Sequence, residues 1–148
     1  MGDLVRDAEK LLDHLGVKDC IFIGLSIGGM IGQGLAVKRL DLIRGIVLSN
    51  TAVKIGQPTM WDERIAAVKE GGIKALADNI MERWFSKSFR AKTELNIWRN
   101  MLTRQENDGY IGCSAAISGT DFFTLTSALR LPVMAIAGSE DGSTPPNL

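Results

Sequence analysis

The sequence Gly24-Leu25-Ser26-Ile27-Gly28 joins a short apolar run to a segment of helical character. The apolar run, residues 20–24, predicts a strand buried on both faces, as in a parallel sheet. The segment 28–38 predicts a helix that is intrinsically weak, because each of its glycines costs about 1 kcal/mol relative to alanine. Such a helix requires close packing against a sheet. A G-x-S-x-G sequence between a buried strand and a helix is the context of a nucleophile elbow.

A nucleophile elbow requires a particular backbone geometry around Ser26. We expect Ser26 to adopt a strained conformation that pushes its hydroxyl outward, with Gly24 and Gly28 lacking side chains because these would collide. Ser26 would then lie at a helix N-terminus. There the backbone N–H of Ile27 is placed to stabilise an oxyanion.

The same glycine-rich turn is also compatible with other roles. One is a structural turn in which Ser26 simply caps the helix. A dinucleotide site would need an acidic residue about 20 positions further on, but the second strand ends in Ser49-Asn50-Thr51. A phosphate-binding P-loop is excluded, because no Lys-Ser or Lys-Thr pair follows the glycines.

A serine nucleophile also needs a base and an orienting acid. Asp141 follows the last predicted strand, at the carboxyl edge where α/β enzymes place their chemistry; the alternative is a turn-forming Asp before Gly142. His14 is the single histidine. It ends the first predicted helix, so we expect it at the opposite edge of the sheet, roughly 16 Å from Ser26. A proton-transferring histidine must approach within about 3 Å, so His14 cannot serve as the base.

The remaining pattern predicts an α/β fold whose parallel strands are interrupted by a helical insertion. Strands are expected at 45–49 and 131–138 and a helix at 3–15. Four helical stretches are expected between these two strands, at 59–70, 73–85, 93–105 and 110–117. Helix-breaking residues separate or end them at 71–72, 86–88, 108–109 and 119. We expect residues 1–57 to form a core part with the elbow, 58–127 a helical cap or lid, and 128–148 a core part with the acid loop.

The amino-acid composition limits which binding partners and which cellular compartment are expected. Seventeen basic and seventeen acidic residues leave no net charge, so neither nucleic acid nor an anionic membrane is expected as a partner. Two cysteines are too few for a disulfide framework or a zinc site, and no metal is expected; Cys113 is expected to be a small buried residue. The first six residues are unlike a signal peptide, and no apolar run approaches a membrane span. A reducing, cytoplasmic location is expected.

The sequence resembles the α/β-hydrolase fold family and, within it, the 3-oxoadipate enol-lactonases. The resemblance is carried by the elbow and its flanks (20–30), the next strand (46–52), cap segments and the acid loop (138–141). The cap segments are 60–65, 70–72, 82–85 and 109–117. The elbow and acid loop are shared by many hydrolases, whereas the cap segments are more specific to the enol-lactonases.

The resemblance implies that Ser26 is the nucleophile, Asp141 the triad acid and Ile27 an oxyanion donor. It implies hydrolysis of a small-molecule lactone ester to 3-oxoadipate in aromatic-compound catabolism, without a cofactor. Because the substrate carries a carboxylate, a basic cap residue is expected to bind it; Arg83, Trp84 and Trp61 are candidate pocket residues, and Arg64, Arg99 and Arg104 further candidates.

The family's early strands, second oxyanion donor and catalytic histidine have no counterpart here. The chain is therefore expected to be an internal piece, inactive alone, that self-associates through exposed sheet edges. Alternatives are another hydrolase of this fold, such as a carboxylesterase or a cofactor-free perhydrolase, or a non-catalytic fragment or binding module.

Overall fold

The computed structural model describes residues 1–148 as two compact units. The sheet unit comprises residues 1–55 and 120–137, together with Leu148, and the helical unit comprises 56–119 and 138–147. Residues 120–127 therefore group with the sheet, and the loop that carries Asp141 groups with the helices. The expected core and cap boundaries at 57/58 and 127/128 stay a prediction.

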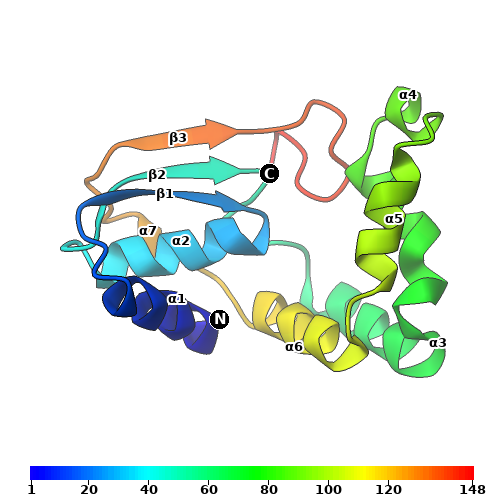
Figure 1. The fold of residues 1–148 in the computed structure, drawn as a ribbon, viewed down its shortest axis with the longest axis horizontal. Helices are drawn as coiled ribbons and strands as arrows, with labels where there is room; N and C mark the ends of the chain where they lie inside the picture. Colours follow the sequence, from blue (N-terminus) through cyan, green and yellow to red (C-terminus); the bar gives the residue numbers. More distant parts are fainter. The chain divides into compact units, whose positions relative to one another are not determined.

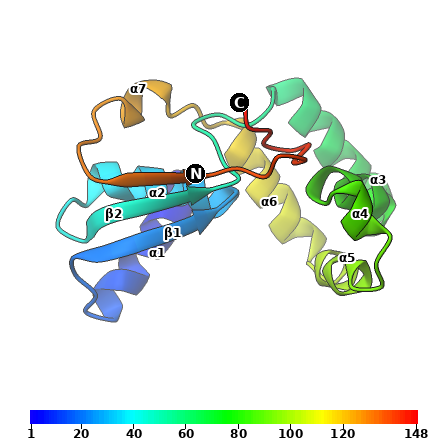
Figure 2. The same ribbon diagram turned by 90° about the horizontal axis from the view of Figure 1, so that it is seen from above.

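The sheet unit contains three parallel strands, as the sequence predicts. They are β1 (Cys20–Leu25), β2 (Ile43–Ser49) and β3 (Val133–Ile136). The strand order is β1-β2-β3 (Figure 2). Leu25 pairs with Ser49 and Ser49 with Ile136, so all three strands end in register at one carboxyl edge. Both β2 and β3 confirm predicted strands, although β2 begins two residues earlier and β3 is shorter at both ends.

Two helices cover one face of this sheet, α1 (Gly2–His14) and α2 (Ile27–Lys38) (Figure 1). Glycines in α2 allow the close packing that its composition requires. A β-carbon on Gly32 would lie 2.7 Å from the Phe22 ring, and one on Gly34 would lie 2.7 Å from Val5 of α1. The core between these elements is aliphatic, with Leu35, Ala36, Leu42, Ile43 and Ile46 buried. The short helix α7 (Phe123–Thr126), which the sequence does not predict, also contacts α2.

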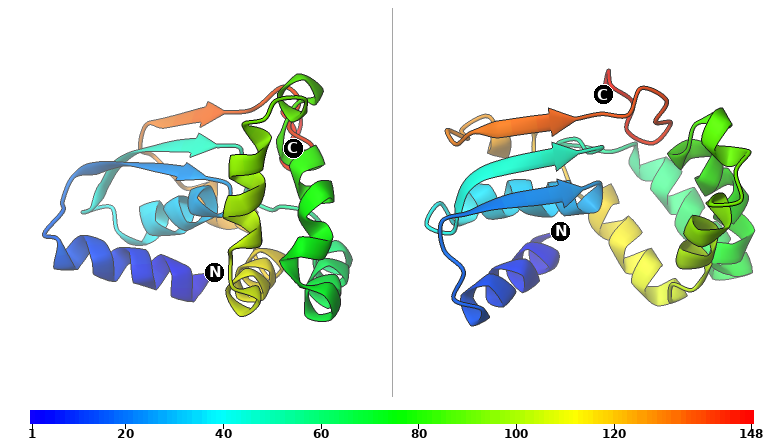
Figure 3. Two further views of the ribbon diagram at one scale, coloured as in Figure 1. Left: turned by 45° about the vertical axis from the view of Figure 1, so that its right-hand side comes forward. Right: turned by 45° about the horizontal axis from the view of Figure 1, so that its top comes forward.

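The other face of the sheet carries no helix of this unit (Figure 3). Alternate residues of β1 point to this face, and Ile23 is 72% exposed, flanked by Ile21 and Leu25. Ile23 lies in register with Val47, which pairs with the exposed Met134 of β3. The result is an apolar sheet surface whose side chains lie open to solvent.

The helical unit contains α3 (Pro58–Trp84), α4 (Lys87–Arg90), α5 (Leu95–Thr103) and α6 (Asn107–Ser118). Helix α3 consists of two segments divided at Gly72, whose φ of 68° and ψ of 175° are non-helical, so the predicted break at 71–72 is confirmed. The Asn107 side-chain oxygen accepts the Ile73 N–H at 3.2 Å and so caps the second segment. The buried core of the helical unit is formed by Val68, Ile73, Ala77, Ile80, Met81 and Leu102.

The expectation of a break at 86–88 is wrong in part. The Ser86 hydroxyl accepts the Phe89 N–H at 3.2 Å, and this cap starts the short helix α4. Serine at such a position begins a helix rather than ending one, because its side chain satisfies a donor in the first turn.

Both cysteines are free, and Cys113 is exposed, so the expectation that it is buried is wrong. It lies on the exposed side of α6, whose buried residues are Ser114 and Ile117. None of the helices combines the length and the apolar character that a bilayer crossing needs. No group of three histidine, cysteine or acidic side chains is arranged to hold a metal ion.

Candidate active site

Ser26 occupies a sharp corner between β1 and α2. Its backbone has φ 53° and ψ −120°, a conformation rare for a non-glycine residue, and the residue is exposed. Its N–H donates to the Ser49 carbonyl at 3.0 Å, and its own carbonyl accepts the Gly29 N–H at 2.9 Å and the Thr51 hydroxyl at 2.7 Å. These bonds hold the backbone in the strained conformation that a nucleophile elbow requires.

The Ser26 side chain does not cap α2. Ser26 is the N-cap residue by position, yet it makes no side-chain capping bond. A capping serine would have extended backbone and accept an N–H from the first turn. The structural alternative of a helix-capping serine is therefore contradicted, and the hydroxyl is left available for chemistry.

The steric role expected of the two glycines holds for one of them. A β-carbon on Gly24 would lie 2.3 Å from the Gly28 carbonyl oxygen, whereas one on Gly28 finds no atom within 4 Å. The expectation that Gly28 avoids a collision is wrong. Gly29 is the crowded position instead, since a β-carbon there would lie 2.5 Å from the Thr51 side chain. The first turn of α2 directs position 28 to open space and position 29 onto the loop after β2.

Ile27 is the first residue of α2 and is half-buried. The first N–H groups of a helix have no intrahelical acceptor, and they carry the positive end of the helix dipole. The Ile27 N–H is thus available to an anion next to Ser26. Its oxyanion role stays a prediction.

Asp141 is held within the helical unit by a tight loop. Its carboxylate accepts the Ser143 N–H at 2.7 Å, the Thr144 N–H at 3.0 Å and the Thr144 hydroxyl at 2.8 Å. The Gly142 N–H donates to the Arg83 carbonyl at 2.9 Å, which ties the loop to the end of α3. Asp141 therefore forms a turn, which was the alternative prediction for this residue. A turn role and a catalytic role are compatible, because the same bonds fix the carboxylate's orientation.

His14 ends α1 and is exposed. The chain passes from it through a short turn into the amino end of β1, whereas Ser26 follows the carboxyl end of that strand. The six residues of β1 span roughly 20 Å at about 3.3 Å each. This placement agrees with the expectation that His14 is not the base for Ser26.

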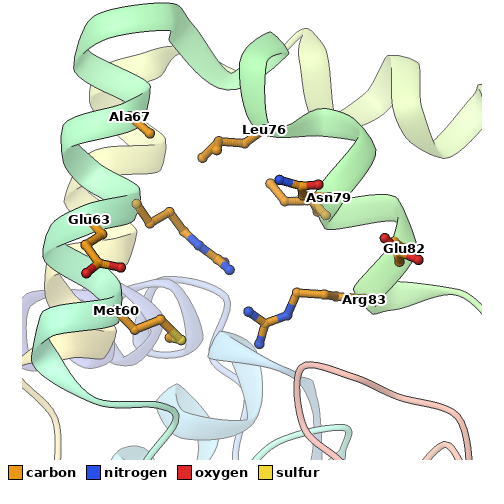
Figure 4. Close-up of a pocket in the computed structure, with 9 residues that line it drawn as sticks. Met60, Glu63, Ala67, Leu76, Asn79, Glu82 and Arg83 are labelled. Atoms are coloured by element: carbon orange, nitrogen blue, oxygen red, sulfur yellow. The ribbon is translucent and has the colours of Figure 1, made fainter.

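A cavity of about 450 Å³ lies between the two segments of α3 (Figure 4). Arg83 lines it, as does Arg64, whose guanidinium lies 5.0 Å from the centroid of the Trp61 ring. Trp61 is buried and Trp84 is 40% exposed, and neither lines the cavity. Burial lowers the pKa of Arg83, and the nearby positive charge of Arg64 lowers it further. The substrate-binding roles of Arg83, Trp84 and Trp61 stay a prediction.

Sequence reasoning missed two residues that support the elbow. Thr51 bonds the Ser26 carbonyl and packs on Gly29, as described above. Gln33 is buried, and its side-chain amide donates to the carbonyls of Gly29 and Ala52 at 3.3 and 3.2 Å. The only sequence signal was a glutamine inside a segment that is otherwise small and apolar. Such a residue must find hydrogen-bond partners when it is buried.

Comparisons with known proteins define the family to which this chain belongs. A model of the alpha/beta hydrolase fold matches residues 1–148. The chain belongs to the α/β-hydrolase fold family. It is 31% identical over 146 residues to 3-oxoadipate enol-lactonase 2 of Acinetobacter baylyi, a match that covers 97% of this chain and 55% of that protein. The family resemblance read from the sequence is thereby confirmed.

Solved structures agree with this assignment. The enol-lactonase from Burkholderia xenovorans LB400 is 31% identical with a TM-score of 0.94, over 99% of this chain and 57% of that one. A hydrolase from Pseudomonas aeruginosa PA01 is 34% identical with a TM-score of 0.90, over 97% and 55% of the respective chains. The predicted α/β-hydrolase architecture is confirmed. The chain spans about half the length of the curated relatives it matches.

Proposed function

We propose that this chain is the part of an enol-lactonase-type hydrolase that carries the serine nucleophile. The observation that supports this most directly is the strained backbone of Ser26, which donates a hydrogen bond to Ser49 and accepts hydrogen bonds from Gly29 and Thr51. Strain of this kind persists only where the surroundings enforce it, and it concentrates at functional sites. The similarity to enol-lactonases supports a lactone ester of a small molecule as the substrate.

The proposed reaction begins with attack of the Ser26 hydroxyl oxygen on the lactone carbonyl. The oxyanion that develops is stabilised by the Ile27 N–H and by the dipole of α2. A general base takes the proton of the Ser26 hydroxyl during attack. Collapse breaks the ring C–O bond, the base passes this proton to the released enol oxygen, and the enol tautomerises to the ketone while the acyl group stays on Ser26. Water then cleaves that ester to give 3-oxoadipate. Asp141 is proposed as the acid that orients the base, and the mechanism needs no cofactor.

The substrate's carboxylate is proposed to meet basic and aromatic residues of the helical unit, with Arg83, Trp84 and Trp61 as candidates. The 148-residue chain has no histidine near Ser26 on the sheet unit, because His14 lies at the amino end of β1. We therefore expect the chain by itself to be inactive. Its two free cysteines are in keeping with the proposed reducing, cytoplasmic setting.

The test is hydrolysis of the enol-lactone and of an aryl acetate, measured with the polypeptide of the complete reading frame that contains this chain and with the 148 residues alone. For the longer polypeptide, Ser26→Ala is expected to reduce kcat by at least about 10³-fold. Ser127→Ala is the matched control, because it removes an exposed hydroxyl of the same unit. Unchanged turnover in Ser26→Ala contradicts the nucleophile assignment.

The same assay separates the alternatives. Faster turnover of the aryl ester than of the lactone indicates a carboxylesterase of this fold. No hydrolysis of either compound by the longer polypeptide favours a binding role. Ser26-dependent turnover by the 148 residues alone overturns the expectation that they are inactive.

We also propose that the chain self-associates through the sheet unit. The support is the apolar face formed by Ile21, Ile23, Leu25 and Met134, together with the open backbone edges of β1 and β3. Exposed apolar strands at an edge favour pairing with another chain.

A further inference from the structure

The peptide group between Ser26 and Ile27 joins the proposed nucleophile to the proposed oxyanion donor. Its two polar groups are the Ser26 carbonyl and the Ile27 N–H. They point to opposite sides of one planar unit, because every peptide bond of the chain is trans. A side chain that holds the Ser26 carbonyl therefore also fixes the direction of the Ile27 N–H.

Thr51 supplies such a contact. Its hydroxyl donates to the Ser26 carbonyl oxygen at 2.7 Å. Two helical bonds to the same oxygen are longer, from the Gly29 N–H at 2.9 Å and the Met30 N–H at 3.3 Å. These come from the first turn of α2, which contains Gly28 and Gly29 and has no side-chain cap. Glycine leaves a backbone conformationally free, so this turn by itself restrains the peptide group weakly.

The loop that carries Thr51 is itself fixed by backbone hydrogen bonds. The Ser49 carbonyl accepts the Ser26 N–H at 3.0 Å, and the Asn50 N–H donates to the Ile136 carbonyl of β3 at 2.8 Å. Asn50 has a φ of 45°, a left-handed conformation that turns the chain after β2. The end of β2 thus brings Thr51 to Ser26 on a backbone that is hydrogen-bonded on both sides.

Gln33 fixes the residue that follows Thr51. Its buried side-chain amide donates to the Ala52 carbonyl at 3.2 Å and to the Gly29 carbonyl at 3.3 Å, so it ties the loop to the beginning of α2. The loop and the helix also touch directly, since a β-carbon on Gly29 would lie 2.5 Å from the Thr51 side chain. The Thr51 hydroxyl is therefore held in place by its surroundings.

We infer that Thr51 is a positioning residue for the oxyanion donor. Its hydroxyl holds the Ser26 carbonyl and so directs the Ile27 N–H towards the oxygen that becomes negative when the serine attacks. The same bond polarises the peptide group and makes its N–H a stronger donor, because hydrogen bonds that share a group strengthen one another. This role rests on the proposed function, since it concerns the N–H that is proposed to face the oxyanion.

The experiment measures hydrolysis of the enol-lactone and of an aryl acetate by the polypeptide of the complete reading frame with Thr51→Val, which replaces the hydroxyl by a methyl group of similar size. We expect kcat to fall about tenfold with KM unchanged, because the oxyanion develops only on the way to the transition state. This loss is smaller than the roughly 10²-fold that removal of an oxyanion donor costs, since the Ile27 N–H is still present. Inhibition by phenylboronic acid, whose tetrahedral adduct with serine places an oxygen at the oxyanion position, is expected to weaken by a similar factor.

Two further variants separate positioning from a general loss of stability. Thr126→Val is the matched control, because the Thr126 hydroxyl also donates to a backbone carbonyl of the sheet unit, that of Phe122 at 2.8 Å. It is expected to leave kcat and inhibition by phenylboronic acid unchanged. Thr51→Ser keeps the hydroxyl and is expected to retain most of kcat. An equal loss of kcat in Thr51→Ser and Thr51→Val overturns the inference, since the hydroxyl would then not be responsible.

Failure of this role is distinguishable from failure of the proposed function. Loss of turnover in Ser26→Ala together with full kcat in Thr51→Val overturns the positioning role and leaves the nucleophile assignment standing. Unchanged turnover in Ser26→Ala overturns both.

The contact also has a readout that needs no activity, the NMR signals of the Ser26 carbonyl carbon and the Ile27 N–H in the 148-residue chain. Thr51→Val is expected to shift both signals, because it removes a hydrogen bond from their shared peptide group. Thr126→Val is expected to shift neither. Signals that stay in place in Thr51→Val overturn the inference whatever the activity.

Discussion

The α-carbon of Gly24 faces the carbonyl oxygen of Gly28 so closely that a β-carbon at position 24 would lie 2.3 Å from it. No flexible side chain is involved in this contact, because the opposing atoms belong to the backbone of α2. Gly24 is the single buried residue of β1, and Gly28 lies in the first turn of α2. Their approach sets how sharply the chain turns at Ser26.

Gly24→Ala is therefore expected to lower the free energy of unfolding by at least about 2 kcal/mol, as overpacked sites do. The measurement is urea unfolding. Gly28→Ala is the matched control, because a β-carbon at position 28 finds open space. It is expected to leave stability unchanged or to raise it by up to about 1 kcal/mol through helix propensity. Equal destabilisation by the two substitutions would contradict the geometry.

Asn107→Ala is expected to destabilise the helical unit by about 1 kcal/mol, the usual cost of removing a helix cap. The reason is that the Asn107 side chain accepts the Ile73 N–H where Gly72 interrupts α3. Asn96→Ala is the control, since Asn96 is an exposed helical asparagine whose side chain forms no such bond. Urea unfolding followed by tryptophan emission reports on this unit, which contains all three tryptophans. Similar losses in both variants would count against the cap.

The stability of the sheet unit is expected to decline in acid. Hydrogen bonds from Lys38 and then Arg39 lower the pKa of Glu9, and those from Arg39 lower the pKa values of Asp13 and Asp41. A carboxyl group whose pKa is lower in the folded state stabilises the fold above its unfolded pKa of about 4, and this contribution is lost as pH falls through the folded value. The free energy of unfolding should therefore decrease below about pH 4.

Arg39→Gln tests this pH dependence, because Arg39 bonds all three carboxylates. The variant is expected to show a shallower loss of stability between about pH 5 and pH 2 than the unaltered chain. Arg44→Gln is the control, since Arg44 is exposed and forms no ion pair. Because Asp13 and Asp41 are exposed, added salt should reduce the difference. An unchanged pH profile in Arg39→Gln would be inconsistent with this network.

Ile23→Lys is expected to reduce self-association, since it places a charge at the centre of the apolar sheet face. Sedimentation velocity over a range of concentrations measures this. Ile97→Lys makes the same change on α5 of the helical unit, where Ile97 is 66% exposed, and is expected to have little effect. A wild-type chain that stays monomeric at every concentration would refute the self-association proposal.

Much of the fold followed from local pattern. The apolar run 20–24 predicts a strand, which β1 confirms, and Gly72 interrupts α3 because it adopts a positive φ. The expectation that both faces of this strand are buried is wrong, because Ile21, Ile23 and Leu25 are exposed on the face that no helix of the sheet unit covers. The predicted break at 86–88 was wrong in part, because a serine in a polar stretch is typical of a loop, whereas the Ser86 hydroxyl caps α4.

At the candidate site, the sequence by itself determined that a serine stands at a glycine-flanked corner between strand and helix, because residue order and backbone sterics are local properties. It could not decide which glycine carries the steric role, that Thr51 and Gln33 support the corner, or that Arg64 and Arg83 share a cavity. Thr51 lies 25 positions from Ser26, Ala52 lies 19 from Gln33, and Arg83 lies 19 from Arg64, so only the folded backbone brings these residues together. Hydrogen bonding and charge act over a few ångströms of space rather than along the chain, so tertiary structure alone decided them.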